Sequence, residues 1–109
     1  MAKTPSDKWR DTVGKYKIQC QQILKLSNNI RYSGVINSYG RTLTGTIKPN
    51  LKPLLNPEEV KNEFFIVSTL ISMRQVNDSS VGKLDSVILK HSKVNIVILH
   101  KKDITFYIS

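Results

Sequence analysis

The order in which helix-like and strand-like segments follow one another constrains this chain more than any single motif does. A stretch with helical periodicity covers about residues 6–28, and two strand-like runs follow it, joined by a turn over residues 37–40. Asn56 and Pro57 then open a second helix, and residues 84–108 have the pattern of a three-stranded meander. This order predicts an α+β domain with α-ββ-α-βββ topology and an antiparallel sheet.

The length of the chain predicts a single domain. A chain of 109 residues is long enough for one hydrophobic core and too short for two, so we expect one domain over residues 1–109, with residues 1–5 as a flexible tail. No apolar run approaches the ~20 residues of a membrane-spanning helix, and no secretory signal is visible behind the N-terminus. We therefore expect a cytoplasmic protein without a membrane segment.

The first predicted helix carries one apolar stripe. Ser6 is a suitable N-cap, and Asp7 lies favourably in the first turn. Six residues at helical spacing are expected to face the core: Trp9, Val13, Tyr16, Cys20, Ile23 and Leu24. Because the chain has one cysteine, it cannot form an internal disulfide, and the place of Cys20 on the stripe predicts a small buried hydrophobe.

The second predicted helix carries two apolar stripes. One consists of Val60, Phe64, Val67 and Ile71. On the far side lie Phe65, Met73 and Val76, with Ile66 at the margin. The first stripe can pack on the sheet, but the second needs another cover, because several large exposed apolar side chains together are unusual in a soluble monomer. Two covers are open: a partner or second copy, or the chain's own N-terminal segment or proline-rich connection (residues 48–55).

The C-terminal meander indicates where the sheet is buried. Its strand-like runs are separated by short polar connections, as in adjacent antiparallel strands. The middle run, residues 94–99, is apolar at nearly every position, which is typical of a strand covered on both faces. We therefore expect helices on both faces of the sheet.

The charge is positive and unevenly spread. The chain has a formal net charge of +9, and residues 1–56 hold ten Lys and Arg against two Asp. Such a basic half can attract nucleic acid or an acidic protein surface, or it can be an ordinary solvated face. Besides Tyr16, the candidate nucleic-acid contacts are Lys15, Arg31, Tyr32, Tyr39, Arg41, Lys48 and Lys52. The closely spaced strand aromatics of RNA-recognition sheets are missing from the sequence.

No constellation of residues predicts catalysis, a cofactor or a metal. His91 and His100 lie near opposite limits of a hairpin and lack a third ligand at metal-binding spacing. The sequence contains no phosphate-binding loop, dinucleotide fingerprint or nucleophile elbow. We expect a protein that is not an enzyme and that has no catalytic, cofactor-binding or metal-binding residues.

The hairpin segment, residues 30–41 with the sequence IRYSGVINSYGR, resembles the hairpin of the roadblock/longin-like (profilin-like) superfamily, in particular a small archaeal branch of it. This resemblance, together with the element order, extends over about residues 6–109. It implies a five-stranded antiparallel sheet of order 2-1-5-4-3, with the two helices on opposite faces. Such proteins pair through the second helix and the third strand, which implies a homodimer interface at Phe65, Ile66, Met73, Val76, Val87 and Leu89.

The resemblance also implies a function, and the sequence differs from the superfamily in one feature. Superfamily members are non-enzymatic dimeric scaffolds or regulators of small GTPases and motor complexes, so we expect a small GTPase or another acidic protein as partner. Many members end in a further helix, whereas this sequence stops at Ser109, so we expect a less covered sheet on the side of the first helix. Two alternatives stay open: a basic nucleic-acid-binding protein, and a small-molecule sensor.

Overall fold

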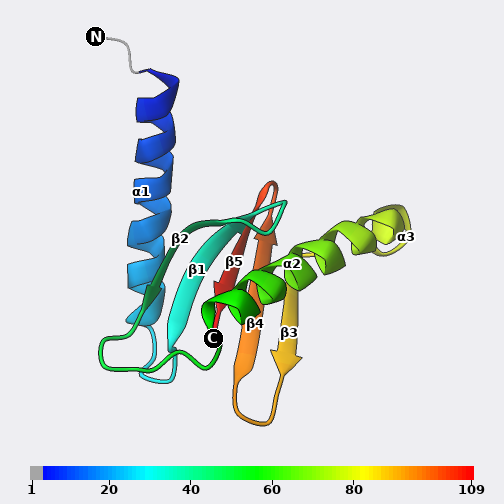
Figure 1. Cartoon of the computed structure of the whole chain (residues 1–109). Coiled ribbons are helices and arrows are strands. Elements are labelled where there is room, and N and C mark those ends of the chain that lie inside the picture. The colour runs from blue at the N-terminus through cyan, green and yellow to red at the C-terminus, as the bar shows by residue number, and fades with distance from the viewer. Residues whose placement is uncertain (1–3) are drawn as a thin grey trace.

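The structure is a computed structural model that describes residues 4–109, and it has the predicted α-ββ-α-βββ order (Figure 1). The long elements are α1 (Pro5–Leu24), β1 (Tyr32–Asn37), β2 (Thr42–Ile47), α2 (Pro57–Arg74), β3 (Ser86–Lys90), β4 (Asn95–Lys101) and β5 (Ile104–Ile108). A 3₁₀ turn η1 (Gln75–Asn77) and a short helix α3 (Asp78–Val81), neither of them predicted, continue α2.

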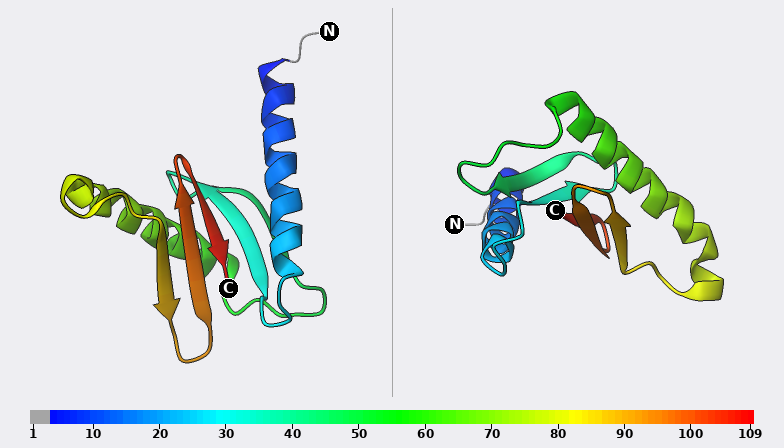
Figure 2. Two further views of the ribbon diagram at one scale, coloured as in Figure 1. Left: turned by 180° about the vertical axis from the view of Figure 1, so that it is seen from behind. Right: turned by 90° about the horizontal axis from the view of Figure 1, so that it is seen from below.

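The sheet has the predicted topology. Its five strands are antiparallel to their neighbours, in the order β2-β1-β5-β4-β3. The two long helices lie on opposite faces, and Figure 2 shows α1 beside the β1–β2 edge while α2 crosses the other face. The predicted fold class is therefore confirmed. In the part of the chain that the structure describes, no helix is both long and apolar enough to cross a membrane.

The N-terminus of α1 lies two residues earlier than predicted. Thr4, not Ser6, is the N-cap: the Asp7 backbone N–H donates to Thr4 Oγ1 at 3.1 Å, and the Thr4 backbone N–H donates to the Asp7 carboxylate at 3.3 Å. This reciprocal capping box satisfies two helix donors. Thr4 and Pro5 thus belong to the helix start and not to a tail, whereas residues 1–3 of the expected tail lie outside the described residues.

Helix α1 is longer than the sheet on which it packs. Its 20 residues span about 30 Å, whereas strands of five to seven residues span only about 17–23 Å. The N-terminal half therefore projects past the strands (Figure 1), and Trp9, expected in the core, is 55% exposed. The C-terminal half packs as predicted, and Cys20 is fully buried with Val35 and Phe106.

The larger core lies under α2. Its buried members come from α2 and from the central strands: Ile36, Phe64, Val67, Ile71, Ile96, Ile98 and Tyr107. The rings of Phe64 and Tyr107 meet edge-on with centroids 5.0 Å apart, and the Tyr107 hydroxyl donates to Glu63 Oε2 at 2.8 Å. The stripe predicted to face the sheet is confirmed, since Phe64, Val67 and Ile71 are buried and Val60 packs against them.

Strand β4 is covered on one face only, contrary to the prediction for residues 94–99. Ile96 and Ile98 are buried beneath α2, but Leu99, which points to the other face, is 36% exposed. The reason is that α1 contacts β1 and β2 and so lies over that side of the sheet. The apolar content of β4 indicates burial but cannot place the helix that would provide it.

Candidate protein-interaction site

The second apolar stripe of α2 is exposed to solvent. We call Phe65, Ile66, Met73 and Val76 the α2 outer face; these side chains are 64%, 58%, 68% and 80% exposed, respectively. The proline-rich connection does not cover them, because it is held beside the start of β1, where the Arg31 guanidinium donates to the backbone oxygen of Lys52 at 2.8 Å. Cover by the chain's own connection is therefore wrong.

The outer edge of β3 lies beside this helix. β3 is an edge strand of the sheet. The backbone N–H of His100 donates to the Asp85 oxygen, and that of His91 donates to the Val94 oxygen. These two bonds show which residues of β3 are hydrogen-bonded to β4. In an antiparallel pair, alternate residues bond to the neighbour. Ser86, Ile88 and Lys90 therefore direct their backbone groups outward, away from β4.

The side chains of the two predicted β3 interface residues point the other way. Val87 and Leu89 are half-buried and pack against the core beneath α2. The exposed apolar side chain of β3 is Ile88, at 65%. A neighbour beside α2 can thus meet β3 through its backbone edge, because the Ile88 side chain points to the opposite face of the sheet. Direct side-chain contacts at Val87 and Leu89 stay a prediction that this geometry does not favour.

The end of α2 projects beyond β3. In Figure 1, α2 crosses the sheet obliquely, and its last turns and α3 lie past the edge strand. Met73 and Val76, together with Val81 of α3 at 70% exposure, are therefore not backed by strands. The α2 outer face and the β3 edge together form one surface, which offers apolar side chains and unpaired backbone groups to the same neighbour.

The total surface of the molecule is large for its size. The chain exposes 8241 Å², whereas a compact monomer of this mass is expected to expose about 6,100 Å². The difference is about 2,000 Å², which is more than the roughly 800 Å² that each partner buries in a standard protein–protein interface. Helices that project past the sheet contribute to this excess (Figure 1).

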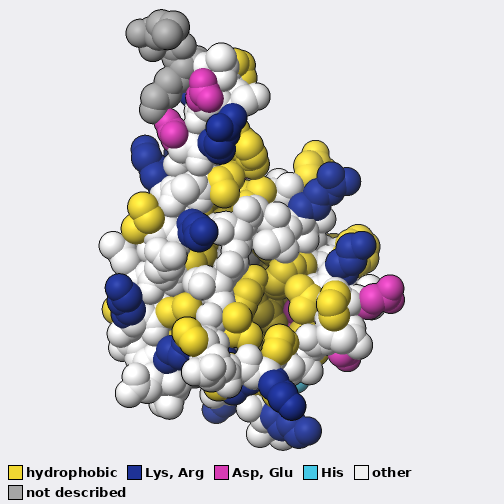
Figure 3. Space-filling view, turned by 60° about the vertical axis from the view of Figure 1, so that its left-hand side comes forward, with side chains coloured by type: hydrophobic (Ala, Val, Ile, Leu, Met, Phe, Trp, Pro, Cys, Tyr) yellow, Lys and Arg dark blue, Asp and Glu magenta, His cyan; other side chains and the backbone are white. Residues whose placement is uncertain are grey.

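The predicted nucleic-acid contacts do not form one surface. Tyr39 and Arg41 lie at the β1–β2 turn, whereas Arg31 and Lys48 lie at the opposite end of these strands, and Lys15 lies on α1. The Lys48 ammonium donates to the backbone oxygen of Ser27 at 2.7 Å, as Arg31 does to Lys52. Figure 3 likewise shows basic side chains scattered singly over the face that it presents.

Tyr32 has a structural role instead of the predicted nucleic-acid contact. Its ring lies over Gly34 and Gly45, which face each other across β1 and β2. Its ring also meets that of Tyr107 edge-on, with centroids 6.1 Å apart. Burial, with a smaller contribution from Cys20, raises the pKa of Tyr32 to about 12. A base stacked on this ring would have to displace the core.

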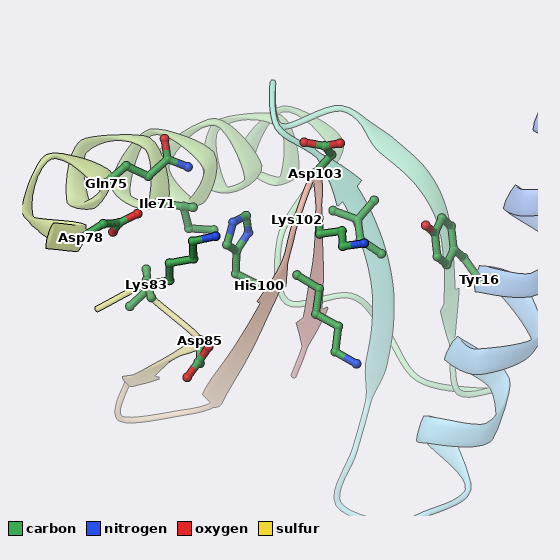
Figure 4. Close-up of a pocket in the computed structure, with 12 residues that line it drawn as sticks. Tyr16, Ile71, Gln75, Asp78, Lys83, Asp85, His100, Lys102 and Asp103 are labelled. Atoms are coloured by element: carbon green, nitrogen blue, oxygen red, sulfur yellow. The ribbon is translucent and has the colours of Figure 1, made fainter. Parts of the chain in front are cut away.

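A hollow of about 660 Å³ lies where α2, α3 and the β4–β5 turn meet (Figure 4). His100, Ile71 and Lys83 lie close together there, while Tyr16 stands apart on α1. His100 Nδ1 is 3.1 Å from Thr105 Oγ1, so one ring nitrogen is engaged within the sheet. The hollow has no nucleophile paired with a base, and no group of three or more metal-ligating side chains occurs among residues 4–109.

Sequence reasoning missed Ile88 and Val81. Val87, Ile88 and Leu89 are all apolar. Only the alternation of side chains along the strand tells which of these three residues face the core. The alternation of Ser86, Ile88 and Lys90 with Val87 and Leu89 is the signal that could have separated the two sets.

The solved structures that are similar in fold include the following three. The gliding protein MglB from Thermus thermophilus has a TM-score of 0.71 at 10% sequence identity, covering 88% of this chain and 71% of that one. A roadblock/LC7 domain from Streptomyces avermitilis has a TM-score of 0.64 at 8% identity, covering 84% and 74%. An MglB structure with a tetrameric arrangement has a TM-score of 0.61 at 9% identity, covering 99% and 74%.

Sequence comparison adds no family assignment. No protein-family model matches the chain, and curated proteins include no significant match. At such low identities the structural likeness concerns the fold alone. The chain has the roadblock/LC7 fold, which confirms at the level of the fold the resemblance of residues 30–41, while the archaeal placement stays a prediction.

Proposed function

We propose that the protein is a non-enzymatic scaffold that pairs with a second copy of itself and binds a partner protein as that dimer, with a small GTPase as the partner class. The α2 outer face carries this proposal. Four large apolar side chains stand 58–80% exposed on one side of α2 and of the 3₁₀ turn η1 that continues it, next to a strand edge whose backbone groups point outward.

A second copy fits this surface because apolar side chains can pack on apolar side chains and one strand edge can pair with another. A twofold axis beside β3 would set the two β3 strands edge to edge and the two α2 helices side by side, as an isologous contact requires. Burying each large apolar side chain contributes roughly 1.5–3 kcal/mol. The tetrameric arrangement described for one MglB structure supports self-association on this fold.

The partner class comes from the resemblance and from charge. Roadblock-like proteins act on small GTPases and motor complexes, and the net charge of +9 favours encounter with an acidic protein surface. A dimer would double that charge. The α2 outer face thus lies between the two copies, and the overall positive charge attracts the partner.

Replacing Phe65 by glutamate tests the pairing. We expect the wild type to sediment as a dimer at ~100 μM, above a micromolar dissociation constant, and Phe65→Glu to sediment as a monomer, because a carboxylate cannot be buried there unpaired. Leu54→Glu, at a side chain 53% exposed in the proline-rich connection, is the matched control and should stay dimeric. A wild type that is monomeric at this concentration contradicts the pairing.

Immobilised protein tests the partner class separately. Wild type and Phe65→Glu are each exposed to native lysate, and the retained fractions are assayed for bound guanine nucleotide. We expect nucleotide-binding protein to be retained by the wild type and lost with Phe65→Glu. If no guanine nucleotide is retained by either, the GTPase assignment is wrong even where the dimer is present.

A further inference from the structure

A second apolar surface lies on the opposite side of the sheet. Along β3, β4 and β5, the side chains that alternate away from α2 include Ile88, Val97, Leu99 and Phe106, and cross-strand pairing brings Ile88 beside Val97 and Leu99 beside Phe106. Phe106 is already buried against α1, so we call the other three residues, Ile88, Val97 and Leu99, the open sheet face. Seen from behind (Figure 2, left), β3 and β4 have no helix in front of them, and α1 stands beside β1.

The uncovered width matches one helix. Adjacent strands lie about 4.8 Å apart, and a helix with its side chains is about 10 Å wide, so one helix covers about two strands. Helix α1 contacts β1 and β2 and leaves β4 and β3 for another. A groove of about 360 Å³ already runs between α1 and this face, lined by Gln19, Gln22, Leu26, Leu99, Lys101 and Phe106.

The charged side chains that β3 and β4 direct to this face are both lysines. Lys90 and Lys101 lie on the same side of the sheet as Ile88 and Leu99, one toward each end of the apolar block. On α1, Lys15 precedes Gln19 by one turn and so shares the flank that faces the groove. The residues of β3, β4 and β5 that point to this face include no aspartate or glutamate.

We propose that the open sheet face binds an acidic amphipathic helix of a partner protein. The apolar side of that helix packs on Ile88 and Leu99, and its carboxylates lie beside Lys90 and Lys101. A second copy of this chain is a poor occupant, because it brings a net charge of +9 to a face that is already basic. This surface is separate from the α2 outer face, so the inference does not depend on the proposed pairing.

A designed peptide pair tests this inference on the full chain. The probe is a fluorescein-labelled 18-residue helix with leucines on one side and glutamates on its flanks, and its counterpart has lysine in place of every glutamate. Binding is followed by fluorescence anisotropy. We expect the acidic peptide to bind at least about tenfold more tightly than the basic one.

Point variants separate this face from general attraction by the net charge. Lys101→Glu and Lys52→Glu change the net charge equally, but only Lys101 lies at the open sheet face. We expect Lys101→Glu to weaken binding of the acidic peptide by about tenfold and Lys52→Glu by less than about twofold. Leu99→Gln should weaken it by about tenfold, and Leu54→Gln, another exposed leucine, should leave it unchanged.

Three results would overturn the inference. The first is equal binding of the acidic and basic peptides. The second is an equal loss in Lys101→Glu and Lys52→Glu, which would mean attraction by net charge alone. The third is a dimer that Leu99→Gln dissociates and Phe65→Glu leaves intact, because the occupant would then be a second copy. This third result would also contradict the proposed pairing through the α2 outer face, whereas the first two results do not bear on that pairing.

Discussion

At the scale of single residues, Tyr32 shows how the hairpin is shaped by one side chain. Its ring occupies the space in which side chains of Gly34 and Gly45 would stand. Those two glycines pair directly across β1 and β2, so both strands lack a side chain at the place where the tyrosine crosses them. The ring replaces the packing that glycine cannot provide in a strand.

Gly45→Ala is therefore expected to destabilise the protein by about 1–3 kcal/mol, because its new Cβ would overlap the Tyr32 ring and force repacking. Gly14→Ala is the matched control: it lies in α1, where an added Cβ meets nothing within 4 Å, and it should stabilise the protein by up to about 1 kcal/mol. Urea unfolding measures both, and equal effects of the two substitutions would refute the role of the ring.

The buried tyrosines also predict an alkaline limit to stability. Folding raises the pKa of Tyr32 from its usual value near 10 to about 12, and burial, reinforced by the bond to Glu63, raises the pKa of Tyr107 as well. The unfolded chain thus loses these protons at lower pH than the folded chain. The contribution of Tyr32 is fully present below a pH of about 10 and is lost as the pH rises toward about 12.

Urea unfolding at pH values of about 9 and 11 checks this dependence. We expect Tyr32 to account for a loss of about 1 kcal/mol at the higher pH, so Tyr32→Phe should unfold with a smaller pH dependence than the wild type. Tyr39→Phe, at a side chain 81% exposed, should behave like the wild type. A pH dependence unchanged in Tyr32→Phe would contradict the assignment.

At the scale of elements, both long helices begin with a capping box, but they differ in how deeply the turns after the cap are buried. Asn56 and Glu59 form a reciprocal capping box at α2, with the Glu59 backbone N–H 2.8 Å from Asn56 Oδ1, as Thr4 and Asp7 do at α1. The first turns of α2 lead directly into buried residues such as Phe64, whereas those of α1 lead to the exposed Trp9. A cap sets where a helix starts; the length of the sheet decides how much of it is buried.

The phase of β3 gives a prediction with an internal control. The Ile88 amide points out of the sheet, whereas the Val87 and Leu89 amides face β4. If a second copy adds to this edge, hydrogen exchange at Ile88 should slow as the protein concentration rises, because its N–H gains a partner. Exchange at Val87 and Leu89 should depend far less on concentration. An Ile88 amide that exchanges equally fast at all concentrations would show that β3 is not the pairing edge.

At the scale of the whole molecule, the chain is more extended than its length requires. Its radius of gyration is 14.9 Å, against roughly 13 Å expected for a compact domain of this length. Helix α1 projects past one end of the sheet and α2 past the β3 edge (Figure 1). The two proposed contacts lie on opposite faces, so a dimer through α2 leaves both open sheet faces available for partner helices.

The sequence alone determined the order of the elements, the start of α2, the core stripe of α2 and the burial of Cys20, because these follow from local spacing and capping chemistry. The surplus apolar side of α2 was also readable from its periodicity. Only the tertiary structure decided which face of β3 is exposed, how far Trp9 lies from the sheet and which half of the sheet α1 covers. These depend on strand register and on the relative lengths of helix and sheet, and neither is encoded within one segment.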